Sequence, residues 1–270
     1  MLTERPAPIG IIGGTGMETF PELIVYERRV VETPYGAPSD ALWFAEYRGV
    51  PVVFLPRHGM NHQHAPHRIP YRANIAALKA CGVRTVVSTC IVGSLKKTIR
   101  PGTFVLPDQF VHFTQARGDG GDDETFVHLP MAEPYCELLR QEVQLALLEK
   151  EAVVHDKGTI VVIQGPRFST KAESQFFIRN RWDVVNMTQY PEVYFAREAG
   201  LCYASMASVT DWDVGVGTTL SMDPRNMDQV LAIFRRNVQT TQAAVLHLID
   251  RLPAFACDCS QRLVAEYYKQ

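Results

Sequence analysis

The sequence has almost no net charge. Its 270 residues include 27 Lys and Arg against 29 Asp and Glu, for a formal net charge of −2, and the basic residues are scattered. Nucleic acids and anionic membrane surfaces attract proteins through a concentrated positive field. The composition therefore argues against both partners and favours small-molecule ligands.

Long hydrophobic runs are also missing. None approaches the ~18 apolar residues of a membrane-spanning helix. The first ten residues, MLTERPAPIG, hold an acid, a base and two prolines where a signal peptide would be apolar. We therefore expect a cytoplasmic protein. With 46% hydrophobic and 21% charged residues, and neither an internal repeat nor a linker, we expect one globular domain over residues 1–270.

Cysteine is sparse, with six residues in the chain. Most stand alone in apolar stretches, which is typical of buried thiols. Cys257 and Cys259 are one residue apart, a spacing too tight for a complete four-ligand zinc site but open to a local disulfide. In a reducing cytosol, free thiols are the favoured state.

Short apolar runs alternate with helical patterns along the whole chain. This alternation is typical of an α/β sandwich with a largely parallel or mixed central sheet. Buried strands are predicted at residues 50–56, 84–93, 102–111, 157–165, 183–187 and 202–211, and helices at 71–82, 135–151, 171–181, 191–200 and 228–252. A Gly- and Asp-rich segment, residues 115–126, is either a lid or a solvated surface loop.

The stretch IGIIGGTGMETF (residues 9–20) is an apolar strand that ends in a glycine-rich turn. A dinucleotide-binding fingerprint, G-x-G-x-x-G, would need a glycine where Thr19 follows Gly14 and Gly16. Two interpretations stay open. The turn is either purely structural, or its backbone N–H groups and the Thr15 hydroxyl cradle a phosphate or another small oxyanion.

Polar groups follow six of the predicted strands. Because ligands bind at the carboxyl ends of strands in α/β sheets, we expect these groups to meet at one site. An Arg fork with Thr hydroxyls would bind an oxyanion. Phe168 and Met187 would form an apolar floor, and Asp211 and Asp213 would accept hydrogen bonds from a ligand. The strand-end residues are Gly14 and Thr15, Arg57 to Gly59, Thr89 and Cys90, Gly93 and Ser94, Gly165 to Phe168, Asn186 to Thr188, and Thr210 to Asp213.

Four short motifs carry a family resemblance. They are GPRFS (165–169), NMT (186–188), PEVYFAREAG (191–200) and TDWD (210–213). Together with the glycine-rich turn and RHG (57–59), and in the same order over almost the whole chain, they resemble the methylthioadenosine phosphorylase branch of the trimeric purine nucleoside phosphorylase family.

The resemblance implies a fold, an assembly and a reaction. The fold is a three-layer α/β sandwich whose mixed, partly barrel-like central sheet is flanked by helices. The assembly is a homotrimer or a dimer of trimers. The reaction is attack of inorganic phosphate, a co-substrate, on C1' of a nucleoside, here methylthioadenosine, so that adenine leaves and 5-methylthioribose 1-phosphate forms.

The resemblance also implies roles for individual residues, each at a matching motif position. The phosphate contacts are Thr15, Arg57, His58 and Thr188, with Thr89 in place of the less suitable thiol of Cys90. The nucleoside contacts are Phe168, Asn186, Met187, Thr210, Asp211 and Asp213, with Met227, Val230 and Leu231 around the 5' group and His128 lent to the neighbouring subunit.

Asp211 and Asp213 are the predicted catalytic residues. The transition state carries positive charge on the sugar and negative charge on the departing purine, so phosphate serves as nucleophile and as counter-charge. A buried, protonated Asp211 could donate a proton to N7. The alternative is a purely structural role, in which Phe168 and Met187 belong to the hydrophobic core and Asp213 is an acidic residue in a turn.

No metal or organic cofactor is expected. Four histidines, His58, His62, His64 and His67, invite a zinc interpretation, but Gly59, Pro66 and Pro70 break any helix that would align them. The sequence therefore does not favour a metal at this cluster.

Three functions stay open. They are a methylthioadenosine phosphorylase, a 6-oxopurine nucleoside or methylthioinosine phosphorylase on the same scaffold, and a non-catalytic nucleotide-binding protein. Ser169 and Asp211 stand where phosphorylases for inosine and guanosine typically carry Glu and Asn, which favours a 6-amino purine. Ile91 replaces a smaller family residue and is expected to crowd the sugar.

Overall fold

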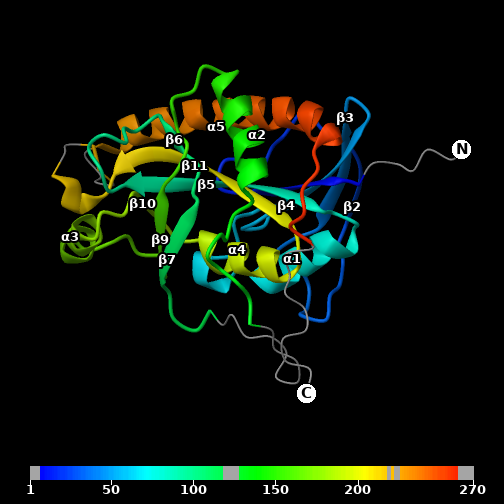
Figure 1. Ribbon diagram of the computed structural model, residues 1–270, viewed down its shortest axis with the longest axis horizontal. Coiled ribbons are helices and arrows are strands. Elements are labelled where there is room, and N and C mark those ends of the chain that lie inside the picture. The colour runs from blue at the N-terminus through cyan, green and yellow to red at the C-terminus, as the bar shows by residue number, and fades with distance from the viewer. Residues whose placement is uncertain (1–6, 118–127, 218–219, 222–225, 261–270) are drawn as a thin grey trace, which may run out of the picture.

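The computed structural model describes residues 7–117, 128–217, 220–221 and 226–260 (Figure 1). In this part of the chain one mixed sheet of eleven strands forms the middle layer. The strands are β1 (Ile9–Gly13), β2 (Ile24–Arg29), β3 (Leu42–Tyr47), β4 (Val50–Pro56), β5 (Thr85–Ser94), β6 (Phe104–Val105), β7 (Gln109–Phe113), β8 (Val154–His155), β9 (Thr159–Ile163), β10 (Val184–Asn186) and β11 (Cys202–Trp212).

The sheet branches at β5. One path runs β2-β3-β4-β1-β5-β10-β9-β7, while β11 also pairs with β5 and leads on to β6 and β8. Strands β1, β4, β5 and β11 are mutually parallel along their pairings, whereas β10 is antiparallel to β5. A strand with three partners lets the sheet curl, as a partly barrel-like sheet requires.

Helices cover both faces of the sheet (Figure 1). One pair packs together on each side, and α3 lies at one end of the molecule, so the predicted α/β sandwich is confirmed. All five helices of the prediction are present within two residues of the expected starts. They are α2 (Glu137–Leu148) with α5 (Met227–Arg251), α1 (Tyr71–Ala80) with α4 (Gln189–Glu198), and α3 (Lys171–Arg179).

Two hydrophobic clusters hold these layers together. Phe54, Val143 and Val245 belong to the cluster that joins the sheet to α2 and α5. Ile75 and Val193 belong to the second cluster, which joins the sheet to α1 and α4. The apolar faces of the predicted helices therefore bury where the sequence periodicity places them.

The strand predicted over residues 102–111 is wrong as a single element. It divides into β6 and β7 around Pro107, because proline has no N–H to donate to a sheet ladder. Strands β2 and β3 have no counterpart in the prediction. Among the described strands, β2 pairs with β3 alone, and its Ile24 and Tyr26 are exposed. Because β2 has no buried face, its sequence does not alternate between apolar and polar residues, and this alternation is the signal that predicts a half-buried strand.

The favoured state of free thiols is wrong for two of the six cysteines. A disulfide joins Cys202 to Cys257, 55 residues apart, and no local bridge forms between Cys257 and Cys259. The other four cysteines are in no disulfide. The sequence did not predict this pairing, because Cys202 in β11 and Cys257 after α5 are far apart in the chain and only folding brings them together.

Within the described residues, every helix is too short or too polar to span a bilayer.

The direction of β10 brings distant strand ends together. Val184 pairs with Ser94 and Val185 with Gly93, so the short strand β10 lies beside the last residues of β5. Thr89 and Cys90, which were expected to follow a strand, lie inside β5. In β11, the register with β5 shifts between Val209 and Asp211, and such a bulge re-aims the side chains beside it.

Candidate active site

A cavity of about 420 Å³ lies where β1, β4, β10 and β11 end. It is lined by most of the residues that the sequence selected. These are Thr15, Arg57, His58, Phe168, Asn186, Met187, Thr188, Thr210, Asp211, Asp213, Met227, Val230 and Leu231. Polar groups from the first strands, apolar side chains and two carboxyl groups thus share one space.

Arg57, the residue after β4, is a buried cation that lines this cavity, with 1% of its surface exposed. Its Nε and Nη2 donate to the two carboxylate oxygens of Glu192 over 2.6 and 2.9 Å, Nη2 also donates to Ser88 Oγ, and Nη1 donates to the carbonyl of Thr89. Burial alone would lower the pKa of Arg57, but the Glu192 carboxylate raises it above its ordinary value. Arg57 therefore stays charged.

The expected Arg fork is already occupied by Glu192. An arginine side chain has five N–H donors, and four of those of Arg57 reach protein acceptors. One N–H on Nη1 remains, so Arg57 can give an anion a positive charge and a single hydrogen bond. The sequence analysis missed the role of Glu192, which lies in the PEVYFAREAG motif, because its partner Arg57 is 135 residues away in the chain.

The glycine-rich turn packs against β5. The N–H of Gly14 donates to Thr89 Oγ1 over 3.0 Å, and the Thr89 hydroxyl points back to the carbonyl of Ile12. Thr89 is not among the residues that line the cavity. It braces the turn instead of making the direct phosphate contact expected of it, whereas the exposed Thr15 does border the cavity.

His58 also lines the cavity, and its imidazole ring is neutral. Burial lowers its pKa to about 4, and the positive charge of Arg57 adds to this, against the opposing effect of the His64 carbonyl. Its Nδ1 lies 2.8 Å from that carbonyl, which can only accept, so Nδ1 carries the proton. Nε2 is then an acceptor, suited to a hydroxyl of a protonated phosphate rather than to a bare oxyanion.

Two carboxyl groups, those of Asp211 and Asp213 at the end of β11, also line the cavity. Burial raises the pKa of Asp211 to about 7, a hydrogen bond from the Thr210 hydroxyl opposes this rise, and the charge of Asp213 adds to it. Burial likewise raises the pKa of Asp213. The Oδ2 atom of Asp213 and the Oγ of Ser169 are buried without a hydrogen-bond partner among the described residues. Such atoms are available to the polar edge of a ligand.

Part of the cavity lining is apolar, through Phe168, Met187, Val230 and Leu231. Phe168 is 54% exposed, so it is not the buried core residue of the structural alternative. Phe234, one turn after Leu231 on α5, also lines the cavity and was missed. The i, i+3 and i+4 spacing on the predicted helix was the signal that could have found it.

Three other expectations from the sequence concern His128, the lid candidate and the histidine cluster. His128 is exposed and is not a lining residue, so its predicted contribution to a neighbouring subunit stays a prediction. Most of the lid candidate, residues 118–126, lies outside the described residues. Among the described residues, the histidine cluster forms no group of potential metal ligands, and His58 and His62 instead stack at 4.4 Å.

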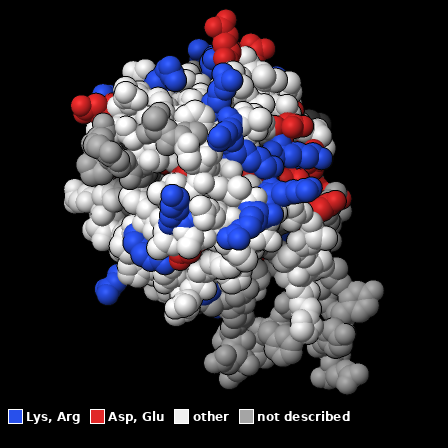
Figure 2. Space-filling model, turned by 90° about the vertical axis from the view of Figure 1, so that its left-hand side faces the viewer, with Lys and Arg blue, Asp and Glu red and all other residues white. Residues whose placement is uncertain are grey.

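The end of the molecule that carries α3 is mainly positive (Figure 2). Lys and Arg form a band across this face, with Asp and Glu mostly toward its outline. Folding thus gathers basic residues that are scattered in the sequence. Because α3 begins just after Phe168 and Ser169, this face adjoins the cavity, where a positive potential favours the approach of an anion.

Comparison with known proteins covers almost the whole chain. The model of the phosphorylase superfamily matches residues 8–250. An S-methyl-5'-thioadenosine phosphorylase from Mycobacterium tuberculosis is 46% identical over 246 residues, 90% of this chain and 89% of that protein. A purine nucleoside phosphorylase from Streptomyces coelicolor is 41% identical over 275 residues, 97% of this chain and 96% of that protein.

A solved structure agrees with the sequence relatives. A mutant adenosine/methylthioadenosine phosphorylase from Schistosoma mansoni, in complex with methylthioadenosine, has a TM-score of 0.88 and 36% identity, and the match covers 96% of this chain and 97% of that one. The TM-score and the identity over nearly the full length show that the two proteins share a fold. The chain is a member of the phosphorylase superfamily.

Proposed function

We propose that this protein catalyses the phosphate-dependent cleavage of the N-glycosidic bond of 5'-methylthioadenosine, giving adenine and 5-methylthioribose 1-phosphate. One observation carries the proposal. A buried carboxyl group with a pKa of about 7, Asp211, lines the same cavity as the buried cation Arg57. An anion site and a proton donor in one space suit the transfer of a glycosyl group from a purine to phosphate.

The residues divide the reaction between them. Arg57 and Thr15 attract phosphate, whose charge then stabilises the positive charge that develops at C1'. The apolar part of the lining excludes water, which would otherwise compete as nucleophile. Protonated Asp211 donates to N7 of the purine as the C1'–N9 bond breaks, so the base leaves neutral. We propose that no metal ion or organic cofactor takes part in these steps.

A 6-oxopurine substrate is the second candidate, because the Streptomyces coelicolor relative is named a purine nucleoside phosphorylase. The unpartnered acceptor of Asp213 favours the 6-amino purine. A carboxylate accepts a hydrogen bond from an amino group and repels a carbonyl oxygen. The hydroxyl of Ser169 suits either purine, so it does not decide between them.

Chromatography of released bases tests the proposal. Methylthioadenosine, adenosine, inosine and methylthioinosine are each incubated with the enzyme, with and without phosphate. We expect adenine from methylthioadenosine only when phosphate is present. Hypoxanthine as the faster product would replace the proposal with the 6-oxopurine alternative, and release without phosphate would make the protein a hydrolase.

Replacing Asp211 with Asn tests the general acid. The amide cannot supply a proton, so kcat for methylthioadenosine should fall by about 10²-fold or more. Methylthioinosine should suffer less, because the amide N–H can donate to O6. Steady-state kinetics on both substrates measure the ratio of kcat/KM, with Asp250→Asn, on the surface of α5, as the control. An unchanged ratio contradicts the assignment.

The pKa of Asp211 also sets the pH dependence. The folded protein holds this proton between the ordinary pKa of 3.8 and about 7, whereas the unfolded chain has lost it. The protonated carboxyl group of Asp211 therefore contributes to the free energy of unfolding below pH 3.8, and this contribution is lost as the pH rises through 7. We expect activity to fall above pH 7, and Asp211→Asn to raise the melting temperature at pH 8. A lower Tm would attribute the lost activity to damage of the fold.

Glu192 should act through Arg57. In Glu192→Gln the charge of Arg57 loses its buried partner, a change that typically costs about 3–5 kcal/mol of unfolding free energy. The freed guanidinium also loses its orientation, so KM for phosphate should rise by roughly tenfold or more while KM for the nucleoside changes less. Glu198→Gln, on the same helix and paired with Arg72 at 3.7 Å, is the control. Equal changes in both KM values would remove Glu192 from the phosphate end.

We also propose a homotrimer or a dimer of trimers in which His128 reaches the neighbouring cavity. The opening at Phe168 and Leu231 exposes apolar surface, which a neighbouring subunit would cover. Co-refolding of His128→Ala with Asp211→Asn subunits tests this. Neither variant alone should be active, but about a quarter of the sites in mixed assemblies would hold both native residues. A fully active His128→Ala protein, or no recovery on mixing, overturns the arrangement.

A further inference from the structure

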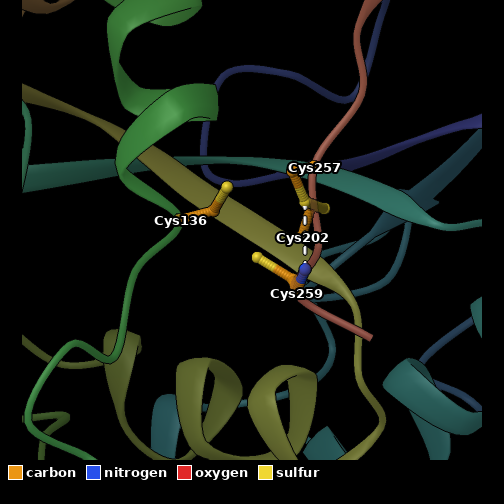
Figure 3. A group of neighbouring side chains, drawn as sticks. All are labelled: Cys136, Cys202, Cys257 and Cys259. Atoms are coloured by element: carbon orange, nitrogen blue, oxygen red, sulfur yellow. Dashed lines mark hydrogen bonds between the residues drawn. A yellow bond between two sulfur atoms is a disulfide. The ribbon is translucent and has the colours of Figure 1, made fainter. Parts of the chain in front are cut away.

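Four cysteines from three parts of the chain meet where α2 and β11 begin (Figure 3). Cys136 is the residue before α2, Cys202 is the first residue of β11, and Cys257 and Cys259 follow η4 (Leu252–Ala254). Their four Sγ atoms all lie within 4.8 Å of one another. Among the described residues, no other group of three or more Cys, His, Asp or Glu is placed in this way.

Rigid elements position the first two sulfur atoms. The N–H of Cys136 donates to the carbonyl of Tyr203 over 2.9 Å, which fixes the start of α2 beside the start of β11. Cys136, Cys202 and Cys259 are buried, and Cys257 is half-buried. The cluster is therefore shielded from bulk solvent and held by two elements of the core.

Two local features favour negative charge on these sulfur atoms. The N–H of Cys259 points at Cys257 Sγ over 3.3 Å, a bond that stabilises a thiolate. Cys136 occupies the N-terminal end of α2, where no side chain caps the helix, so the positive end of the helix dipole faces the cluster.

The spacing suits one tetrahedral ion. With Zn–S bonds of about 2.3 Å, the sulfur atoms of a tetrahedral site stand about 3.8 Å apart. Iron–sulfur clusters place thiolates on different irons and spread them more widely. The four Sγ atoms of the cluster all lie within 4.8 Å of one another, which is close to the spacing of a tetrahedral zinc site.

We propose that the four cysteines, when reduced, form a structural tetrathiolate site for one Zn²⁺ ion. Binding replaces four S–H bonds by four Zn–S bonds and releases four protons to the solvent. The Cys202–Cys257 disulfide must first be reduced to two thiols: an added phosphine supplies the two electrons as it is oxidised to the phosphine oxide, and water supplies the two protons and the oxide oxygen. The site joins the segment after α5 to β11, and it is independent of the proposed function.

Metal analysis of the reduced protein tests this proposal. Protein reduced with phosphine, loaded with Zn²⁺ and desalted should retain about one zinc per chain. Cys259→Ser should retain none, because three thiolates hold the ion far less tightly. Cys81→Ser is the matched control, since Cys81 is a half-buried thiol outside the cluster, and it should bind zinc like the native protein.

Cobalt provides a readout that does not depend on a variant folding. Co²⁺ added to the reduced native protein should give the visible bands of a tetrahedral thiolate complex, which Zn²⁺ then abolishes, whereas the disulfide form should give none. Zinc loss in Cys81→Ser as well as in Cys259→Ser would overturn the assignment. So would the absence of cobalt bands when all six thiols of the reduced protein are titratable.

Discussion

The buried ion pair between Arg57 and Glu192 is the constraint on which the site depends. It joins the end of β4 to α4, and Ser88 and Tyr203 complete the bonding of the carboxylate from β5 and β11. Because a buried charge is costly unless it is paired, these elements must come together for Arg57 to be buried at all. The arrangement leaves one N–H group of Arg57 without a protein acceptor among the described residues, and it fixes the guanidinium in place before any ligand arrives.

At Asp211, burial serves the reverse purpose. Burial raises the pKa of Asp211 to about 7, the charge of Asp213 adds to the rise, and the carboxyl group stays partly protonated at neutral pH. Such a group reduces stability at high pH, because ionisation favours the unfolded chain. One cavity is thus lined by a permanent cation, on Arg57, and by a proton donor, on Asp211, a combination that suits a phosphate nucleophile and a purine leaving group.

Strand β11 connects the two chemical features of the molecule. Its last residues carry Thr210 and Asp211 into the cavity, and its first residue, Cys202, belongs to the cysteine cluster at the other end. A proposed ion at that cluster would hold the start of β11 and the segment after α5, the helix that also lines the cavity through Val230. It would act as a distant support, with no part in the chemistry.

The sequence by itself determined the helices, most of the strands and the family, because apolar periodicity and short motifs are local properties. It also placed Arg57, Asp211 and Met187 at one cavity, since strand ends in such sheets converge. Only the tertiary structure decided that Glu192 occupies the Arg57 fork, that Thr89 stands behind the glycine-rich turn, and that Cys136 and Cys202 join Cys257 and Cys259. These contacts join residues far apart in the chain, and no local pattern encodes a partner that only chain packing brings near.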